Sequence, residues 1–216
     1  MDTPIGSPFR LVLVAVDDDL ARAWDRSCRG LPGVEIYRGS ILDVKCDAVV
    51  SPANSFGFMI GEVDAVYARR FGVRLVSRVR DQILEHHGGE LLIGDAEVIE
   101  TADGDIPFLI CAPTMRVPMR VSDTVNPYLA ARAVLRLVRY GHFRGAPFPG
   151  VAVRDLIGVV AMPGLGTGTG GVSAGKCARQ VRAAYEEVVI GRFTMPATLA
   201  EASARHEALT VGRSRR

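Results

Sequence analysis

Residues 51–64, with the sequence SPANSFGFMIGEVD, combine side chains that could hold a sugar and act on a water molecule. Asn54 carries both a hydrogen-bond donor and an acceptor, which suits the hydroxyls of a sugar diol. Asp64 follows ten residues later and can ionise, so it can position or activate water. Both residues also have structural interpretations: Asn54 can bond its own backbone in a turn, and Asp64 and Glu62 can complement a helix dipole. The residue types alone leave these alternatives open.

Residues 163–171, with the sequence PGLGTGTGG, are a second candidate segment. Five glycines fall within the eight residues from Gly164 to Gly171. Glycines let backbone amides approach and wrap phosphate oxygens, and the N-terminus of a following helix adds partial positive charge. The alternative is a mobile linker, but a linker is not usually fixed between a buried strand and a helix. The segment therefore predicts a phosphate-binding loop.

Two familiar phosphate motifs match this segment only in part. Gly166, Gly168 and Gly171 spell GxGxxG, but the dinucleotide fingerprint needs a following strand that ends in an acid. After this segment we expect only one helix and then a tail. Residues 170–176 spell GxxxxGK, but Cys177 stands where a P-loop has the Ser or Thr that holds magnesium. Both motifs are therefore weak indications.

Apolar runs and helical periodicities place both segments between a strand and a helix. Buried strands are expected at residues 11–16, 34–37, 46–51, 96–101, 108–112 and 157–162. Helices are expected at residues 17–28, 63–71, 74–86, 126–140 and 174–189, with a polar helical stretch near 199–209. Asn126 should cap its helix, with Pro127 in the first turn. This alternation favours an α/β protein with a mostly parallel sheet covered on both faces, where ligands bind at the carboxyl ends of strands.

The composition argues against several classes of protein. The 216 residues fit one domain with extensions, and 48% hydrophobic residues suffice for a large core. A net charge of +2 gives no electrostatic case for nucleic acid or an anionic membrane, and Arg213, Arg215 and Arg216 are expected to form a solvated tail. No stretch approaches the ~20 apolar residues that span a bilayer, and no signal-peptide pattern is present. We therefore expect a cytoplasmic protein.

The four cysteines, Cys28, Cys46, Cys111 and Cys177, lie far apart and form no CxxC pair. This spacing does not fit a metal site, and a disulfide scaffold would be shorter and denser in cysteine. We therefore expect reduced thiols, with no metal and no cofactor.

Taken together, these segments resemble the macrodomain family, which binds ADP-ribose, over roughly residues 34–190. The interval from Asn54 to Asp64 matches that of the MacroD-type ADP-ribosyl hydrolases, and residues 164–171 are similar to the family's diphosphate loop. Three segments look closest to a bacterial and phage-associated branch of the family: SPANSFGFM, APTMR and PGLGTGTGG. Three successive segments are similar to the family's GDI, DAIV and NAAN motifs: Arg38–Ile41, Asp47–Val50 and Ser51–Asn54.

The resemblance implies a three-layer α/β/α sandwich with a mixed, mostly parallel sheet. It also implies that Asn54 holds the distal ribose, that Asp64 orients the water or the leaving group, and that the amides of residues 166–171 cradle the diphosphate. The ligand-binding residues that it implies are Ser40, Ile41, Ala53, Asn54, Phe56, Gly61, Glu62, Val63, Gly164, Gly166, Thr167, Gly168, Thr169, Gly170 and Gly171.

Three departures from the family pattern bear on the site. Ser40 replaces the aspartate with which family members bind the adenine amino group. Gly170 stands where many members place an aromatic that packs on the distal ribose, and Phe56 or Phe58 could substitute for it. Met59–Glu62 replaces the usual run of glycines, which narrows access to the backbone.

The resemblance also implies a division of the chain. Residues 1–190 are expected to form the macrodomain, with a strand and helix at 9–30 that add a strand to the edge of the sheet. Residues 191–216 are expected to form a C-terminal extension that is partly helical or flexible. The implied function is binding of ADP-ribose, a related nucleotide or an ADP-ribosylated substrate, with hydrolysis of ADP-ribosyl esters as the catalytic hypothesis. The alternatives are a reader module without turnover and a phage-derived structural protein with a vestigial cleft.

Overall fold

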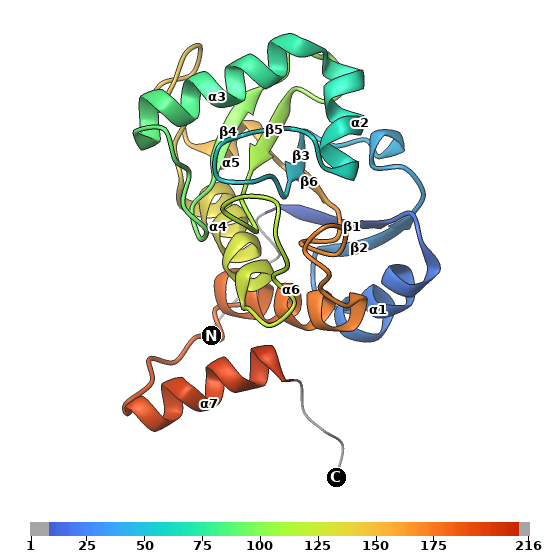
Figure 1. Ribbon diagram of the computed structural model, residues 1–216, viewed down its shortest axis with the longest axis vertical. Coiled ribbons are helices and arrows are strands. Elements are labelled where there is room, and N and C mark those ends of the chain that lie inside the picture. Colours follow the sequence, from blue (N-terminus) through green and yellow to red (C-terminus); the bar gives the residue numbers. More distant parts are fainter. Residues whose placement is uncertain (1–8, 212–216) are drawn as a thin grey trace, which may run out of the picture.

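Six strands form one sheet in the computed structural model, which describes residues 9–211 (Figure 1). Their order across the sheet is β2-β1-β6-β3-β5-β4, and every neighbouring pair is parallel except β4 and β5. The expected mixed, mostly parallel sheet is therefore confirmed. Arg213, Arg215 and Arg216 lie outside the described residues. The strands are β1 (Arg10–Ala15), β2 (Val34–Arg38), β3 (Ala48–Ser51), β4 (Glu97–Glu100), β5 (Phe108–Cys111) and β6 (Val159–Met162).

Helices cover both faces of this sheet (Figure 1). Leu11 and Leu13 belong to a core with residues of α1, α4 and α6, whereas Val12 and Val14 belong to a core with residues of α2 and α3. Successive side chains of a strand point to opposite faces, so a strand that is apolar at every position is buried on both. The three-layer α/β/α sandwich follows from this packing. The helices within residues 9–211 are α1 (Asp18–Cys28), α2 (Glu62–Phe71), α3 (Val73–His87), α4 (Asn126–Tyr140), α5 (Val153–Leu156), α6 (Ala174–Val188) and α7 (Leu199–Thr210), with the 3-10 turn η1 (Ile41–Asp43).

Strand β1 lies inside the sheet, so the expectation that it would add an edge strand is wrong. It pairs in parallel with β2 on one side and with β6 on the other, and Leu11 lies opposite both Val34 and Val160. Residues 11–15 are all buried, which is the burial of a central strand. Trp24 of α1 is fully buried and donates from its ring nitrogen to the carbonyl of Val14 at 3.3 Å. The N-terminal strand and helix are therefore an integral part of the sandwich.

Two local expectations are also corrected. Asn126 does not cap α4 with its side chain; Val125 is the N-cap, and the Asn126 Nδ2 donates instead to the carbonyl of Thr114 at 2.9 Å. This bond ties the start of α4 to the loop after β5. The four-residue helix α5 was not expected, because a single turn is too short to carry a helical period.

Helix α7 lies on the outside of the molecule, beyond α6 (Figure 1). None of its residues is buried, and Gln180 of α6 donates from Nε2 to the carbonyl of Leu209 at 3.1 Å. The expected helical stretch near residues 199–209 is therefore present. Among residues 9–211, none of the helices has the length and apolar character of a transmembrane span.

Candidate functional site

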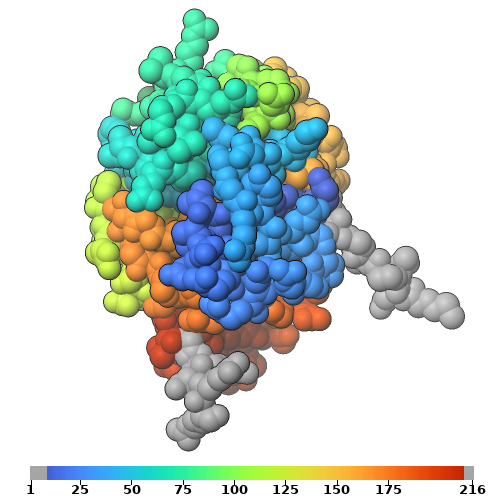
Figure 2. All heavy atoms as spheres, turned by 90° about the vertical axis from the view of Figure 1, so that its right-hand side faces the viewer, coloured from blue at the N-terminus to red at the C-terminus, as the bar shows by residue number. Residues whose placement is uncertain are grey.

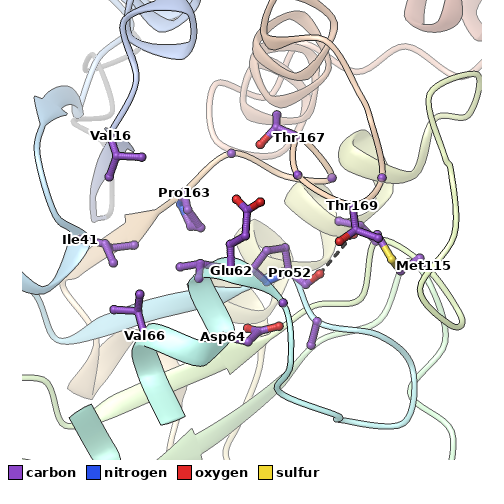
Figure 3. A pocket seen from close by; sticks show the side chains of 18 of the residues that line it. Val16, Ile41, Pro52, Glu62, Asp64, Val66, Met115, Pro163, Thr167 and Thr169 are labelled. Atoms are coloured by element: carbon purple, nitrogen blue, oxygen red, sulfur yellow. Dashed lines mark hydrogen bonds between the residues drawn. The ribbon is translucent and has the colours of Figure 1, made fainter. Parts of the chain in front are cut away.

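A cavity of about 390 Å³ opens where β1, β3 and β6 end, and both candidate segments line it (Figure 3). Parallel strands bring their carboxyl ends to one edge of the sheet, which is why segments far apart in sequence meet there. Figure 2 shows the N-terminal elements (blue), the first segment with α2 (teal) and the glycine-rich segment (orange) side by side on one face. Asp64 lines the cavity together with most of the expected ligand-binding residues: Ser40, Ile41, Ala53, Asn54, Gly61, Glu62, Val63, Gly164, Gly166, Thr167, Gly168, Thr169 and Gly170.

The segment after β6 presents a row of backbone amides without acceptors. The N–H groups of residues 166–170 form no hydrogen bond with any residue between 9 and 211, although all five residues line the cavity. Bonds from Gly171 N–H to the carbonyl of Gly168, at 2.9 Å, and from Val172 N–H to that of Gly166, at 3.0 Å, fold the segment into a turn. We call residues 166–170 the glycine loop. Backbone amides that lack a protein acceptor beside a cavity suit an anion such as a phosphate.

Gly170 has no room for a side chain, which explains the missing aromatic. A Cβ atom built on Gly170 would lie 2.6 Å from the carbonyl oxygen of Gly166 and 2.8 Å from Cγ2 of Val121. Val121 donates its N–H to the carbonyl of Gly170 at 2.8 Å, so this segment occupies the neighbouring space. Met115 and Pro118, from the same segment, line the cavity.

Neither Phe56 nor Phe58 lines the cavity, so neither substitutes for that aromatic. Both line a separate depression on the α3 side, where Arg80 lies 4.5 Å from the ring centroid of Phe58 and Arg116 lies 5.1 Å from that of Phe56. The turn at Gly57, with a φ of 70°, lies between them and carries both rings away from the cleft. Gly171 likewise lies outside the cavity lining.

Asp64 lies in the first turn of α2 and is only 4% exposed. Its Oδ1 accepts a hydrogen bond of 2.6 Å from the hydroxyl of Ser51, the last residue of β3. Burial raises the pKa of Asp64 to about 6, against the smaller opposing effect of the Ser51 hydrogen bond. A carboxyl group with that pKa exchanges protons readily near neutral pH, which suits a general acid or base.

The side chain of Asn54 bonds the backbone of its own loop. Its Nδ2 donates to the carbonyl of Phe58 at 2.8 Å, and its Oδ1 accepts from the N–H groups of Phe56 and Phe58 at 3.1 and 3.3 Å. This is the turn interpretation of the residue. An amide nitrogen has two hydrogens, and the second Nδ2 hydrogen has no partner among residues 9–211, although Asn54 lines the cavity.

The end of the cavity opposite Met115 is apolar. Val16, Ile41 and Val66 lie there together in Figure 3, and Leu20 of α1 also lines the cavity. Such a pocket suits the face of a flat ring.

Two polar residues border this apolar end, and each bonds a backbone amide. Ser40 Oγ accepts from Leu42 N–H at 3.3 Å, and Asp17 Oδ1 accepts from Leu20 N–H at 2.8 Å as the N-cap of α1. The other oxygen of Asp17 has no hydrogen-bond partner among residues 9–211. Sequence reasoning missed Asp17 as a site residue, although an acid directly after a buried strand was a usable signal.

The four cysteines lie outside the cavity lining and are buried free thiols. Burial raises the pKa of Cys28, Cys46 and Cys177 to about 12, so these thiols stay protonated at neutral pH. Cys177 supports the site from behind, because its Sγ accepts from the N–H of Leu165 at 3.3 Å. Within residues 9–211, no three His, Cys, Asp or Glu side chains gather as metal ligands.

Comparison with known proteins gives one family and several structures of similar fold. The family model described as Macro domain matches residues 50–181. The chain is similar to an uncharacterized protein of Aquifex aeolicus, with 35% identity over 68% of this chain and 76% of that protein. It is also similar to an uncharacterized protein of Aeropyrum pernix, with 32% identity over 67% of this chain and 66% of that protein.

Among solved structures, the fold is similar to the macrodomain of Mycobacterium tuberculosis DarG, with a TM-score of 0.56 and 21% identity. That match covers 71% of this chain and 90% of the other. The fold is also similar to the Oceanobacillus iheyensis macrodomain with ADP, with a TM-score of 0.53 and 19% identity over 70% of this chain and 76% of the other.

Because the carboxyl group of Asp64 is buried, we predict that its ionisation lowers the free energy of unfolding by an amount that depends on pH. Its folded pKa of about 6 lies above its ordinary value, so the folded protein holds this proton more tightly than the unfolded chain. The cost is absent below about pH 4, grows as the pH rises to about 6, and then stays constant at about 3 kcal/mol. Asp64→Asn should therefore be more stable than wild type by up to about 3 kcal/mol at about pH 7.5, and by little at about pH 4.

Urea unfolding of both proteins at the two pH values measures this difference. Asp123→Asn is the matched control, because the Asp123 side chain is 98% exposed. Equal differences between Asp64→Asn and wild type at the two pH values would contradict the assignment.

Proposed function

Because this chain belongs to the macrodomain family, we propose that its cleft binds ADP-ribose or a closely related nucleotide. The observation that carries the proposal is the glycine loop, whose five amides have no acceptor within residues 9–211 and border the cavity. A diphosphate supplies acceptors for several such amides at once. The Oceanobacillus iheyensis macrodomain, whose fold is similar, has been solved with ADP, which contains the same diphosphate.

The order of environments along the cleft fits the order of groups in ADP-ribose. The apolar end near Val16 and Ile41 would take the adenine ring, the glycine loop the diphosphate, and the region of Asp64 the distal ribose. Ser40 carries no charge, unlike the aspartate that it replaces. Asp17 would make the adenine contact instead, because its second carboxylate oxygen has no hydrogen-bond partner among residues 9–211. The natural ligand would be ADP-ribose or an ADP-ribosylated protein, and the protein would bind it in the cytoplasm.

Hydrolysis of an ADP-ribosyl ester is the catalytic form of this proposal. Water would attack the anomeric carbon of the distal ribose, and the bond from that carbon to the ester oxygen would break. Asp64 would take a proton from the attacking water and pass it to the departing carboxylate. The products would be free ADP-ribose and the free carboxyl group of the modified side chain. Support comes from the pKa of Asp64 at about 6, because an acid–base catalyst works best when its pKa is near the working pH.

A reader module that binds without turnover is the second candidate. Two observations favour it: the Asn54 amide makes three hydrogen bonds within its own loop, and Gly170 leaves no aromatic to pack on the distal ribose. Both features weaken the contacts with the sugar where a reaction would take place, but neither gives the amides of the glycine loop an acceptor within residues 9–211. A vestigial cleft is less well supported, because its amides are still free to bind.

Binding is tested by calorimetry with ADP-ribose on wild type and Gly168→Glu. The new carboxylate would stand in the diphosphate position and repel it, so affinity should fall by about 100-fold. Folding should survive, because the three atoms nearest to a Cβ on Gly168 all belong to the side chain of Glu62, the first at 3.4 Å. Gly104→Glu is the control, since a Cβ there would meet nothing within 4 Å. Unchanged affinity in Gly168→Glu would remove the glycine loop from the site.

Turnover is tested with a protein that carries ester-linked ADP-ribose. Asp64→Ala should lower kcat by about 10²–10⁴-fold and change ADP-ribose affinity far less, because acid–base assistance acts mainly in the transition state. Asp123→Ala should keep wild-type turnover. Glu62→Ala is measured alongside, because Glu62 is the nearest acid in sequence. Full activity in Asp64→Ala would contradict the mechanism, and binding by wild type without turnover would favour the reader module.

A further inference from the structure

Glu62 projects its carboxylate into the middle of the cleft. Figure 3 shows its side chain rising from the first turn of α2 toward the glycine loop, between the apolar end and Met115. A Cβ built on Gly168 would lie 3.4 Å from Oε2 and 3.7 Å from Oε1 of Glu62. The carboxylate therefore lies against the middle of the loop whose amides suit a phosphate.

No contact within residues 9–211 explains this position as a structural one. Glu62 is exposed, and its carboxylate forms no hydrogen bond or ion pair with any described residue. The ordinary role of an acid in a first helical turn is to complement the helix dipole, and a side chain pointing to open solvent would do so equally well. The carboxylate of Glu62 therefore lies beside a loop whose amides suit an anion.

We propose that Glu62 is a specificity residue that lowers the affinity of the cleft for phosphate-bearing ligands. The inference rests on the proposed function, because it assigns the diphosphate to the glycine loop. With Glu62 ionised, a bound diphosphate either lies beside a like charge or drives the side chain out of the cleft. Either outcome reduces the free energy of binding. The cleft therefore binds ADP-ribose more weakly, and releases it faster, than it would without the Glu62 carboxylate.

The sign of the effect separates this proposal from the other roles open to Glu62. A carboxylate that accepted hydrogen bonds from ribose hydroxyls would add affinity, and its loss would weaken binding. A carboxylate that repels the diphosphate lowers affinity, and its neutralisation tightens binding. Like charges a few ångströms apart at a partly solvated site change affinity by about tenfold or more, and added salt screens the effect.

The experiment is calorimetry with ADP-ribose on wild type, Glu62→Gln and Glu85→Gln, in EDTA so that no divalent cation masks the charge. Glu62→Gln keeps the shape of the side chain and removes its charge. Glu85 is an exposed glutamate of α3 outside the cavity lining and is the matched control. Each protein is measured at about 50 mM and about 500 mM NaCl, where the screening length differs about threefold.

The expected result is about tenfold tighter binding by Glu62→Gln at the lower salt concentration, a smaller gain at the higher one, and no change in Glu85→Gln. Wild type that binds ADP-ribose as well as or better than Glu62→Gln overturns the inference and leaves the proposed function standing. A gain that does not shrink with salt also overturns it, because the cause is then not charge. Binding by neither protein overturns both the inference and the proposed function. Binding by Glu62→Gln alone supports both.

Discussion

Where a buried parallel sheet ends, backbone N–H and C=O groups need hydrogen-bond partners. In the loop after β6, one set of N–H groups has no acceptor among residues 9–211. The turn from β6 to α6 is fixed at both ends: Leu165 donates to the sulfur of Cys177, and Val172 donates back to Gly166. Between these two bonds the amides of residues 166–170 find no acceptor in the described chain. An N–H group without a protein partner must be satisfied by solvent or ligand. The rest of the cleft is arranged around these five donors.

Three acids, Asp17, Glu62 and Asp64, line the cavity, and each lies in a different environment. Asp64 is buried, and the cost of burial raises its pKa to about 6, which reduces the negative charge near the cleft as the pH falls to that value. Asp17 commits one oxygen to the start of α1 and lies by the apolar end. Glu62 is exposed and reaches the glycine loop itself. A cleft of this kind balances attraction by amides against repulsion by carboxylates, so its affinity can be tuned by single side chains.

Sequence patterns located the six strands, the longer helices and the two candidate segments, because hydrophobic period and glycine content are local properties. They did not give the neighbours of a strand: the apolar run at Leu11–Ala15 predicted a buried strand, but its position between β2 and β6 depends on the packing of the whole sheet. They also did not give the direction of side chains in irregular loops. Phe56 follows Asn54 closely in sequence, yet the turn at Gly57 carries the ring to the α3 side.

The account's central claim is that the glycine loop holds the diphosphate of ADP-ribose, and the amides themselves report on it most directly. In a titration of ¹⁵N-labelled protein with ADP-ribose, followed by NMR, the amide resonances of residues 166–170 should move most, as their protons gain phosphate acceptors. Amides of the same kind outside the cleft, such as that of Gly104, should stay in place. Saturable binding that shifts other amides and leaves residues 166–170 unchanged would contradict the account.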